Sequence, residues 1–232
     1  MIHRTVAERQ MRRSRAMTAG ALALLGLLAV SLLDRAVYDA ITWPPERRAA
    51  GELEDWYQML RTAGYLPAWL SVGAAIVLLG REGGDDRAAA RRAATVVLGA
   101  LTAGLVAEAV KMLVGRERPE VSGVDGAWQG YVFRAPFGAF IDSSNLGFPS
   151  SHAATAFGGA FALAAAYPPL RWLALVLACG CGLTRVLSGA HFASDVYGGA
   201  ALGWVASRWW WRGLSGRWGW GGSALPRWER VG

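Results

Sequence analysis

Long apolar runs separated by charged segments dominate the pattern of this chain. Six of them are long enough, or nearly so, to cross the hydrocarbon core of a bilayer as helices, which takes about 20 residues. The six predicted spans are residues 16–33, 62–80, 93–110, 153–170, 172–189 and 196–211. The pattern therefore predicts an all-α, polytopic membrane protein with six transmembrane helices, in which residues 1–232 form a single domain.

The segments between the runs are polar and are expected to be connections. Residues 34–61 are interpreted as a loop with a short interfacial helix, and residues 115–150 as a long Gly-rich loop. Pro168 and Pro169 predict a tight turn between the fourth and fifth spans. The Trp- and Gly-rich tail, residues 212–232, is expected to be irregular.

Arginines gather on one side of this six-span layout. They lie in the basic tail and in three later segments, namely residues 1–15, 81–92, Arg171 and residues 212–232. The positive-inside rule makes that side cytoplasmic, together with both termini. Signal peptides also begin with basic residues and an apolar run. The first run is long for that role and no small-residue cleavage site follows it, so we expect a retained span.

The composition favours a membrane protein over one that binds nucleic acid. Hydrophobic residues make up 53% of the chain and charged residues 18%, whereas soluble domains carry about 25% charged residues. The net charge of +7 is explained by topology, so we expect no nucleic-acid partner. Cys179 and Cys181 lie two apart in an apolar run and point to different sides of a helix, which predicts neither a disulfide nor a metal site.

Three polar segments on the predicted outer face carry the candidate chemistry. They contain Lys111 and Arg118; then Ser150, Ser151 and His152; then Arg185, His191 and Asp195. Ionisable groups at membrane depth are costly and mark functional sites. The cations Lys111, Arg118 and Arg185 are expected to converge on an anion. A phosphate dianion suits them, because arginine pairs two phosphate oxygens at once.

The second and third segments predict an anion site beside a reactive histidine. Ser150 precedes a helical run, which places its hydroxyl and the N–H groups of Ser151 and His152 at a helix N-terminus. His191 and Asp195 are four residues apart and share one face if this stretch is helical. A carboxylate on one ring nitrogen makes the other more nucleophilic. His152 then supplies a separate general acid.

In order and spacing, these segments resemble the signature of the type 2 phosphatidic acid phosphatase family. Its pattern is Lys, six residues, Arg-Pro; then Pro-Ser-Gly-His; then Ser-Arg, five residues, His, three residues, Asp. The family includes bacterial undecaprenyl pyrophosphate phosphatases and shares its site with glucose-6-phosphatase and vanadium haloperoxidases. Ser151 stands where Gly is usual and Thr184 where Ser is usual, and neither position supplies the nucleophile.

The resemblance implies a role for each residue. His191 would attack phosphorus and become phosphohistidine, Asp195 would orient it, and His152 would protonate the leaving lipid oxygen and then activate water. Five residues would bind the phosphate: Lys111, Arg118, Ser150, Ser151 and Arg185. No metal or other cofactor is required by this scheme.

The implied substrate is a lipid phosphate in the bilayer, such as undecaprenyl pyrophosphate, phosphatidic acid or phosphatidylglycerol phosphate. The implied location is a bacterial inner membrane, with the site on the extracytoplasmic side. Two alternatives are weighed. The six apolar spans argue against a vanadium-haloperoxidase-like enzyme, because those relatives are soluble. His152 and His191 argue against a non-catalytic binding or transport protein, because simple binding needs cations but no paired imidazoles.

Other residues near the motifs are given structural roles. Glu108 lies one turn before Lys111 and is expected to neutralise that buried cation. Arg116 lies within the first motif but off its pattern, and is expected to be a rim charge. The glycine pairs at residues 158–159 and 198–199 are expected to permit close helix packing.

Overall fold

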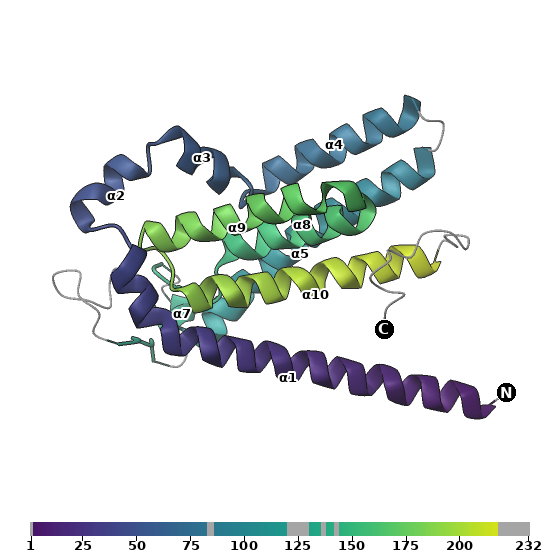
Figure 1. Ribbon diagram of the computed structural model, residues 1–232, viewed down its shortest axis with the longest axis horizontal. Coiled ribbons are helices and arrows are strands. Elements are labelled where there is room, and N and C mark those ends of the chain that lie inside the picture. The colour runs from purple at the N-terminus through teal and green to yellow at the C-terminus, as the bar shows by residue number, and fades with distance from the viewer. Residues whose placement is uncertain (1, 83–85, 120–129, 136–137, 142–143, 218–232) are drawn as a thin grey trace.

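The computed structural model of the protein is helical, as predicted, and it describes residues 2–82, 86–119, 130–135, 138–141 and 144–217. The elements of this part of the chain, shown in Figure 1, are α1 (Ile2–Ile41), α2 (Pro45–Gly51), α3 (Asp55–Thr62), α4 (Leu66–Glu82), α5 (Asp86–Val114), α7 (Gly138–Ile141), α8 (Ser151–Ala166), the 3₁₀ turn η2 (Pro168–Leu170), α9 (Arg171–Leu187) and α10 (Ala193–Arg217). Each predicted span overlaps one long helix. The turn predicted at Pro168 and Pro169 is η2.

Helix α8 lies at the centre of the bundle and packs against α5, α9 and α10 (Figure 1). Glycines bring these backbones together. A Cβ atom added to Gly99 would lie 3.0 Å from the carbonyl oxygen of Gly158, and one added to Gly203 would lie 2.6 Å from the Gly158 nitrogen. Close backbone approach is what holds helices together in a bilayer, where apolar surfaces gain little from one another. The packing role predicted for the glycine pairs is confirmed, since Gly199 likewise abuts Ser150.

The N-terminal helices surround this centre. Helix α1 lies along α10, α3 packs against α9, and α4 packs against α5 (Figure 1). The prediction that a loop begins at residue 34 is wrong, because α1 continues to Ile41. Asp34 does not end the helix, since its carboxylate is buried and hydrogen-bonded. Helices α2 and α3 occupy most of the remaining predicted loop.

Two other boundaries also differ from the prediction. Helix α5 begins at Asp86 rather than at residue 93, and α10 runs to Arg217, beyond the predicted start of the tail at residue 212. Charged residues are tolerated at helix ends that reach water, so the helices outlast their apolar runs. The rest of the predicted tail lies outside the described residues.

The described residues of the predicted loop at 115–150 contain local structure. Two isolated β-bridges, Arg116 with Phe133 and Glu117 with Leu146, fold the described part of this segment back on itself. The short helix α7 lies between Phe133 and Leu146 in the sequence. This folding directs residues just after α5 inward, toward the start of α8.

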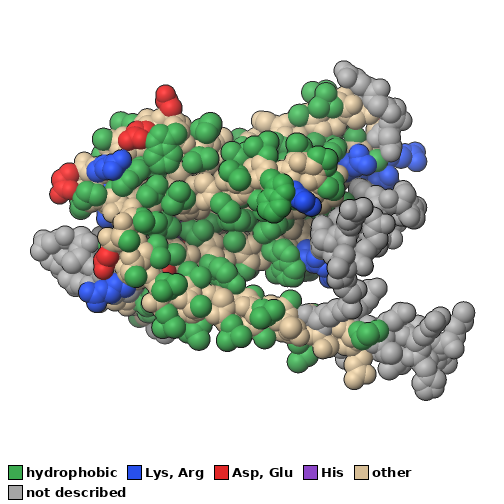
Figure 2. All heavy atoms as spheres, in the orientation of Figure 1, with side chains coloured by type: hydrophobic (Ala, Val, Ile, Leu, Met, Phe, Trp, Pro, Cys, Tyr) green, Lys and Arg blue, Asp and Glu red, His purple; other side chains and the backbone are tan. Residues whose placement is uncertain are grey.

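Within the described residues, three stretches are long and apolar enough to cross a membrane: Ala16–Ile41, Asp86–Val114 and Pro168–Leu187. A bent pair, Asp55–Thr62 with Leu66–Gly80, forms a possible fourth, with a 66° angle at the break. Helix α8 has 16 residues and is not among these stretches, and neither is α10. Hydrophobic side chains cover the middle of the molecule and charged ones gather toward its two ends (Figure 2). This surface is that of a membrane protein.

Candidate active site

The three motif segments meet at one end of the bundle, on the left in Figure 1. They are the C-terminal end of α5, the N-terminal end of α8 and the junction between α9 and α10. Because α8 packs against α5, α9 and α10, segments distant in sequence are brought to the same end of the bundle.

Lys111 stands in the last turn of α5, which Gly115 ends. Gly115 has φ +67° and donates its N–H to the Lys111 carbonyl at 2.8 Å, a helix ending that favours glycine. The Lys111 ammonium is buried and lies 2.9 Å from Glu108 Oε1 and 2.9 Å from Ser151 Oγ. The expected neutralising contact of Glu108 is confirmed, and Lys111 is joined directly to the second motif.

Ser150 caps α8 at its N-terminus. Its Oγ accepts a hydrogen bond from the Ala153 N–H at 3.4 Å, and its own N–H donates to the Asp195 carbonyl at 2.9 Å. The amides of Ser151 and His152 lie in the first turn, where no intrahelical acceptor exists. The helix N-terminus expected from the sequence is therefore present and is tied to the third motif.

His191 and Asp195 are neighbours, but not because they share a helical face. Helix α10 begins at Ala193, so His191 lies before it. Asp195 reaches back over the helix start, where its Oδ2 accepts the Phe192 N–H at 2.8 Å, as in a capping box. The same oxygen lies 3.5 Å from His191 Nδ1, within ion-pair distance but without the geometry of a hydrogen bond. The expectation of a shared helical face was wrong, although the pair forms.

Burial controls the charge of His191. The side chain is 2% exposed, and burial lowers the pKa of His191 to about 4, while Asp195 acts in the opposite direction. The cations Arg185 and Lys111 lower the pKa further. At neutral pH the ring is therefore uncharged, which is the state that a nucleophile needs.

His152 and Arg185 approach the site from α8 and α9. The His152 ring stands edge-on to Tyr65, with centroids 4.9 Å apart. Arg185 donates from Nη1 to the Tyr57 hydroxyl at 3.1 Å. His152 Nε2 and Arg185 Nε are buried without a protein partner. Buried polar atoms usually have partners, so these are groups that a phosphate can satisfy.

Arg118 completes the set of predicted residues. Its Nε donates to the Leu146 carbonyl at 3.3 Å, and its backbone N–H donates to the Asn145 carbonyl at 3.1 Å. Its charge acts on Lys111. The fold thus gathers all the predicted site residues at one end of the bundle: Lys111, Arg118, Ser150, Ser151, His152, Arg185, His191 and Asp195.

Arg116 is not the rim charge that the sequence predicted. It is 6% exposed and its Nη2 forms an ion pair with Asp195 Oδ1. The guanidinium lies over the rings of Phe148, Tyr131 and Phe192, at 4.7 Å, 4.9 Å and 5.4 Å from their centroids. The β-bridge at Arg116 explains the error, because it turns this stretch into the protein.

Asp34 was missed by the sequence analysis. This α1 carboxylate is 1% exposed, and its Oδ1 accepts the Ser194 N–H at 2.9 Å. Its Oδ2 accepts the Ser194 hydroxyl and, at 2.8 Å, the Tyr131 hydroxyl. Burial and the neighbouring Asp34 raise the pKa of Tyr131 to about 12, so the phenol remains a donor. An ionisable group inside a membrane span marks a functional site. Had the first predicted span been extended to residue 41, Asp34 would have been recognised as such a group.

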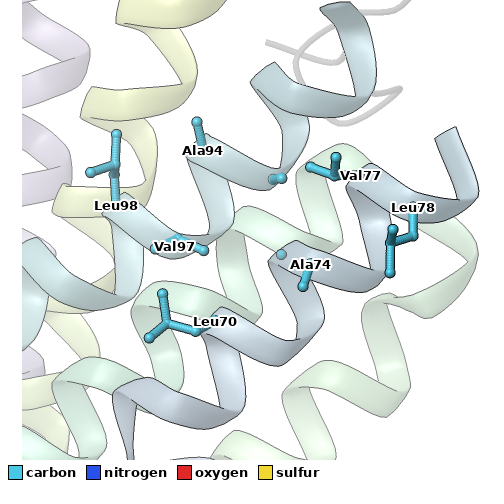
Figure 3. A pocket seen from close by; sticks show the side chains of 9 residues that line it. Leu70, Ala74, Val77, Leu78, Ala94, Val97 and Leu98 are labelled. Carbon is cyan, nitrogen blue, oxygen red and sulfur yellow. The ribbon is translucent and has the colours of Figure 1, made fainter. Parts of the chain in front are cut away.

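Apolar cavities lead away from these groups along α4 and α5. One, of about 260 Å³, is lined at its polar end by Glu108, Ser151 and His152, and elsewhere by α4 and α5 residues such as Leu66 and Leu105. A second, separate cavity of about 640 Å³ lies further along the same two helices and is lined by residues such as Leu70, Ala74, Val97 and Leu98 (Figure 3). Their lining residues recur at helical spacing, so both cavities lie along one side of the α4–α5 contact.

Fold and site together define a helical membrane protein with two imidazoles and several cations at one end of its bundle. The model of the PAP2 superfamily matches residues 92–218, more than half of the chain. The chain belongs to the PAP2 superfamily, and the family resemblance seen in the sequence is confirmed.

Curated relatives include lipid A 1-phosphatases of Rhizobium johnstonii and Rhizobium etli, which are 39% and 37% identical to this chain over 102 residues. These alignments cover 43% of this chain and 38% and 40% of the relatives, so the chain spans about two fifths of their length. Among solved structures, the fold is similar to a transmembrane PAP2 type phosphatidylglycerolphosphate phosphatase from Bacillus subtilis. The TM-score is 0.55 at 21% identity, over 85% of this chain and 96% of the other.

Proposed function

We propose that the protein is a membrane lipid phosphatase that hydrolyses a phosphomonoester or pyrophosphate of a lipid through a phosphohistidine at His191. The observation that carries this proposal is the buried His191–Asp195 pair in a site that also holds His152 and three cations. Binding an anion needs the cations alone, whereas two imidazoles supply a nucleophile and a general acid. Membership of the PAP2 superfamily supports the same reaction class.

The first step is an in-line displacement. With its Nδ1 proton directed at Asp195, neutral His191 attacks phosphorus through Nε2, and the bond from phosphorus to the lipid oxygen breaks. His152 carries a proton when the phosphate anion is bound beside it, because a nearby anion favours the charged imidazolium, and it gives that proton to the lipid oxygen. Asp195 stabilises the positive charge that develops on the His191 ring.

The second step releases the phosphate. His152, now neutral, takes a proton from water as the water oxygen attacks phosphorus. The bond between phosphorus and His191 Nε2 breaks, and inorganic phosphate leaves. Both histidines return to their starting states, as a catalytic cycle requires.

Cations stabilise the charge on the transferring group. Lys111, Arg118 and Arg185 interact with its non-bridging oxygens, together with the amides of Ser151 and His152 and the Ser150 hydroxyl. These fixed donors neutralise the charge that a metal ion neutralises in other phosphoryl-transfer enzymes. The proposed reaction is therefore independent of metal.

A lipid substrate is supported by the groove between α4 and α5. One cavity is lined by His152 and Ser151, and the other lies further along the same two helices, so a headgroup at the motifs would have space for its hydrocarbon chains along α4 and α5. Candidate headgroups are those of undecaprenyl pyrophosphate, phosphatidic acid and phosphatidylglycerol phosphate. The relatives named lipid A 1-phosphatase add lipid A to these candidates.

We also propose that α1, α4, α5, α8, α9 and α10 all cross a bacterial inner membrane, with both termini cytoplasmic and residues 1–232 forming one domain. The start of α1, the end of α4, turn η2 and the end of α10 lie at one end of the bundle, opposite the site (Figure 1). Arginines concentrate in and next to these ends. The site then faces the extracytoplasmic side.

Phosphate release tests this function. Purified protein in detergent with EDTA is given the four lipid types in parallel, and release from one or more is expected. Acid-labile phosphate should appear on wild-type protein quenched during turnover and be absent from His191→Ala. Binding of these lipids without release would favour a non-catalytic role, and activity restored only by added metal would contradict metal independence.

A further inference from the structure

We propose that Arg116 and Asp34 are positioning residues behind the nucleophile: Arg116 shares the Asp195 carboxylate with His191, and Asp34 fixes Arg116 through Ser194. Their catalytic meaning rests on the function proposed above. The sequence motifs contain neither residue in such a role, and Asp34 comes from a helix outside the matched family region.

The two oxygens of Asp195 have different partners. Oδ1 pairs with the Arg116 guanidinium, while Oδ2 accepts the Phe192 N–H at 2.8 Å and faces His191 Nδ1 at 3.5 Å. Charge-assisted bonds of the first kind are strong and directional. With Oδ1 held, the carboxylate cannot rotate, so Oδ2 remains the oxygen presented to His191.

Arg116 is itself held from behind. Its Nη2 donates to Ser194 Oγ at 2.9 Å. Arginine has no acceptor, so the Ser194 hydroxyl must accept from Arg116 and direct its own proton to Asp34 Oδ2. Asp34 Oδ1 also holds the Ser194 N–H at 2.9 Å. The direction of every hydrogen bond from α1 to Asp195 is thereby fixed.

The contacts from Asp34 to Asp195 affect the protonation of His191 through the balance of buried charges. Asp34, Asp195 and Arg116 are each at most 6% exposed, so water screens them little. A buried carboxylate without a paired cation either takes up a proton itself or raises the pKa of a neighbouring base, which then takes up a proton. By pairing with Asp195, Arg116 keeps the carboxylate from drawing a proton onto the His191 ring.

Other charged groups also face His191 from the surrounding elements. Those acting on it most directly are Asp195 of α10, Arg185 of α9 and Lys111 of α5, and its ring interacts with His152 of α8. Asp34 of α1 acts through Ser194. Tyr131, which follows α5 in the sequence, stays uncharged because its pKa is about 12. Asp195 faces both Arg116 and the His191 ring, so the effect of Arg116 on the ring runs through this carboxylate.

The test is a titration of the His191 ring by nitrogen NMR in detergent micelles, combined with the pH profile of kcat/KM. In Arg116→Gln, the His191 midpoint and the acidic limb of kcat/KM are expected to move up together by about one pH unit. Arg116→Lys keeps the charge and should restore both toward wild type. A residue that only supports the fold would shift neither midpoint.

Asp34→Asn provides an independent test with an isosteric side chain. We expect kcat to fall about tenfold with KM unchanged, because the carboxylate at His191 is less well held. The matched control is Asp39→Asn, the same substitution in the same helix at an exposed residue paired with Arg35, which should leave kcat unchanged. Arg134→Gln, which breaks an ion pair with Glu117, controls for the loss of a partly buried arginine.

The outcomes separate this inference from the proposed function. An active wild type with no shift in Arg116→Gln, or equal losses in Asp34→Asn and Asp39→Asn, overturns the inference alone. A wild type that releases no phosphate from any lipid overturns the proposed function, yet the His191 titration still decides whether Arg116 controls the ring. A shift that Arg116→Lys does not reverse assigns the effect to altered packing and overturns the inference.

Discussion

The helices that carry the motifs and the helices beside them are packed in contrasting ways. Helices α5, α8 and α10 meet backbone to backbone at Gly99, Gly158 and Gly203. Helices α4 and α5 instead flank a groove of about 640 Å³ (Figure 3). Reacting groups must be held to within about 0.5 Å, which the glycine contacts allow, whereas a lipid chain needs space along the helices. The glycine contacts and the groove thus serve the two needs of one site.

The flanking helices also contact the residues of the site. Each of two N-terminal elements contributes a buried polar group to the motif side, Asp34 of α1 to Ser194 and Tyr57 of α3 to Arg185. Tyr57 is fully buried. The flanking helices therefore contact the motif helices at a few defined points, and the contrast between the two regions can be tested by substitution.

The largest effect is expected at the nucleophile in the tightly packed half. His191→Gln keeps polarity and approximate size but cannot form phosphohistidine, so kcat should fall by about 10³-fold or more. Phosphate release is the measurement, and gel filtration with thermal unfolding checks that the variant folds. Near-normal turnover by a folded variant would rule out the covalent route.

A smaller effect, about 10²-fold or more, is expected when the general acid is removed. His152→Asn should reduce hydrolysis of a lipid phosphate strongly, because the alkoxide leaving group needs a proton. An aryl phosphate such as p-nitrophenyl phosphate leaves without that proton, so its loss should be much smaller. Equal losses for both substrates would contradict the role of His152 as an acid.

The packing contrast predicts unequal responses to the same glycine change. Gly203→Ala places a methyl group 2.6 Å from the Gly158 nitrogen, which backbone cannot avoid, so about 1–3 kcal/mol of stability should be lost. Gly20→Ala in α1 is the control, because nothing lies within 4 Å of its added Cβ atom. Thermal unfolding in detergent measures both. Similar losses would mean that the two halves are packed alike.

Filling the groove should affect only substrates with long chains. Ala74→Trp places a large ring where Ala74 lines the groove (Figure 3). Displacing about two methylenes of a lipid chain from it should lower kcat/KM about tenfold, at roughly 0.8 kcal/mol each. A short-chain soluble substrate should be hydrolysed as before. Ala75→Trp is the control, because Ala75 is an exposed neighbour outside the lining. An equal effect of this variant would exclude the groove as the binding site of the lipid chain.

The smallest expected effect is on stability against pH. Because burial lowers the pKa of His191 to about 4, the unfolded chain binds more protons than the folded one between about pH 6.5 and pH 4. Stability therefore falls as the pH falls through this window, by under about 1 kcal/mol between pH 7 and pH 6. The difference between the unfolding midpoints of wild type and His191→Gln should become smaller as the pH is lowered. An unchanged difference would indicate that water reaches the ring.

The sequence alone was sufficient for the fold class and for the residues that the fold gathers at one end. Hydropathy is a local property, and so are the motif spacings in chain order, which explains why six helices overlap the predicted spans and why Lys111, Ser150 and His191 could be named. The helix ends were less predictable. The charged residues 34 and 86 lie outside the apolar runs, but Asp34 is buried by its partners and Asp86 lies exposed in the first turn of α5.

Only the tertiary structure revealed Arg116, Asp34 and the groove. Arg116 pairs with a residue 79 positions away, and Asp34 bonds to one 160 positions away, and no local pattern encodes such distances. Whether a charged residue lies at the rim or inside depends on the partner that compensates its burial. The hydropathy of α4 and α5 marked them as membrane helices, but the space between them arises from how their small residues pack, which is decided only when the helices assemble.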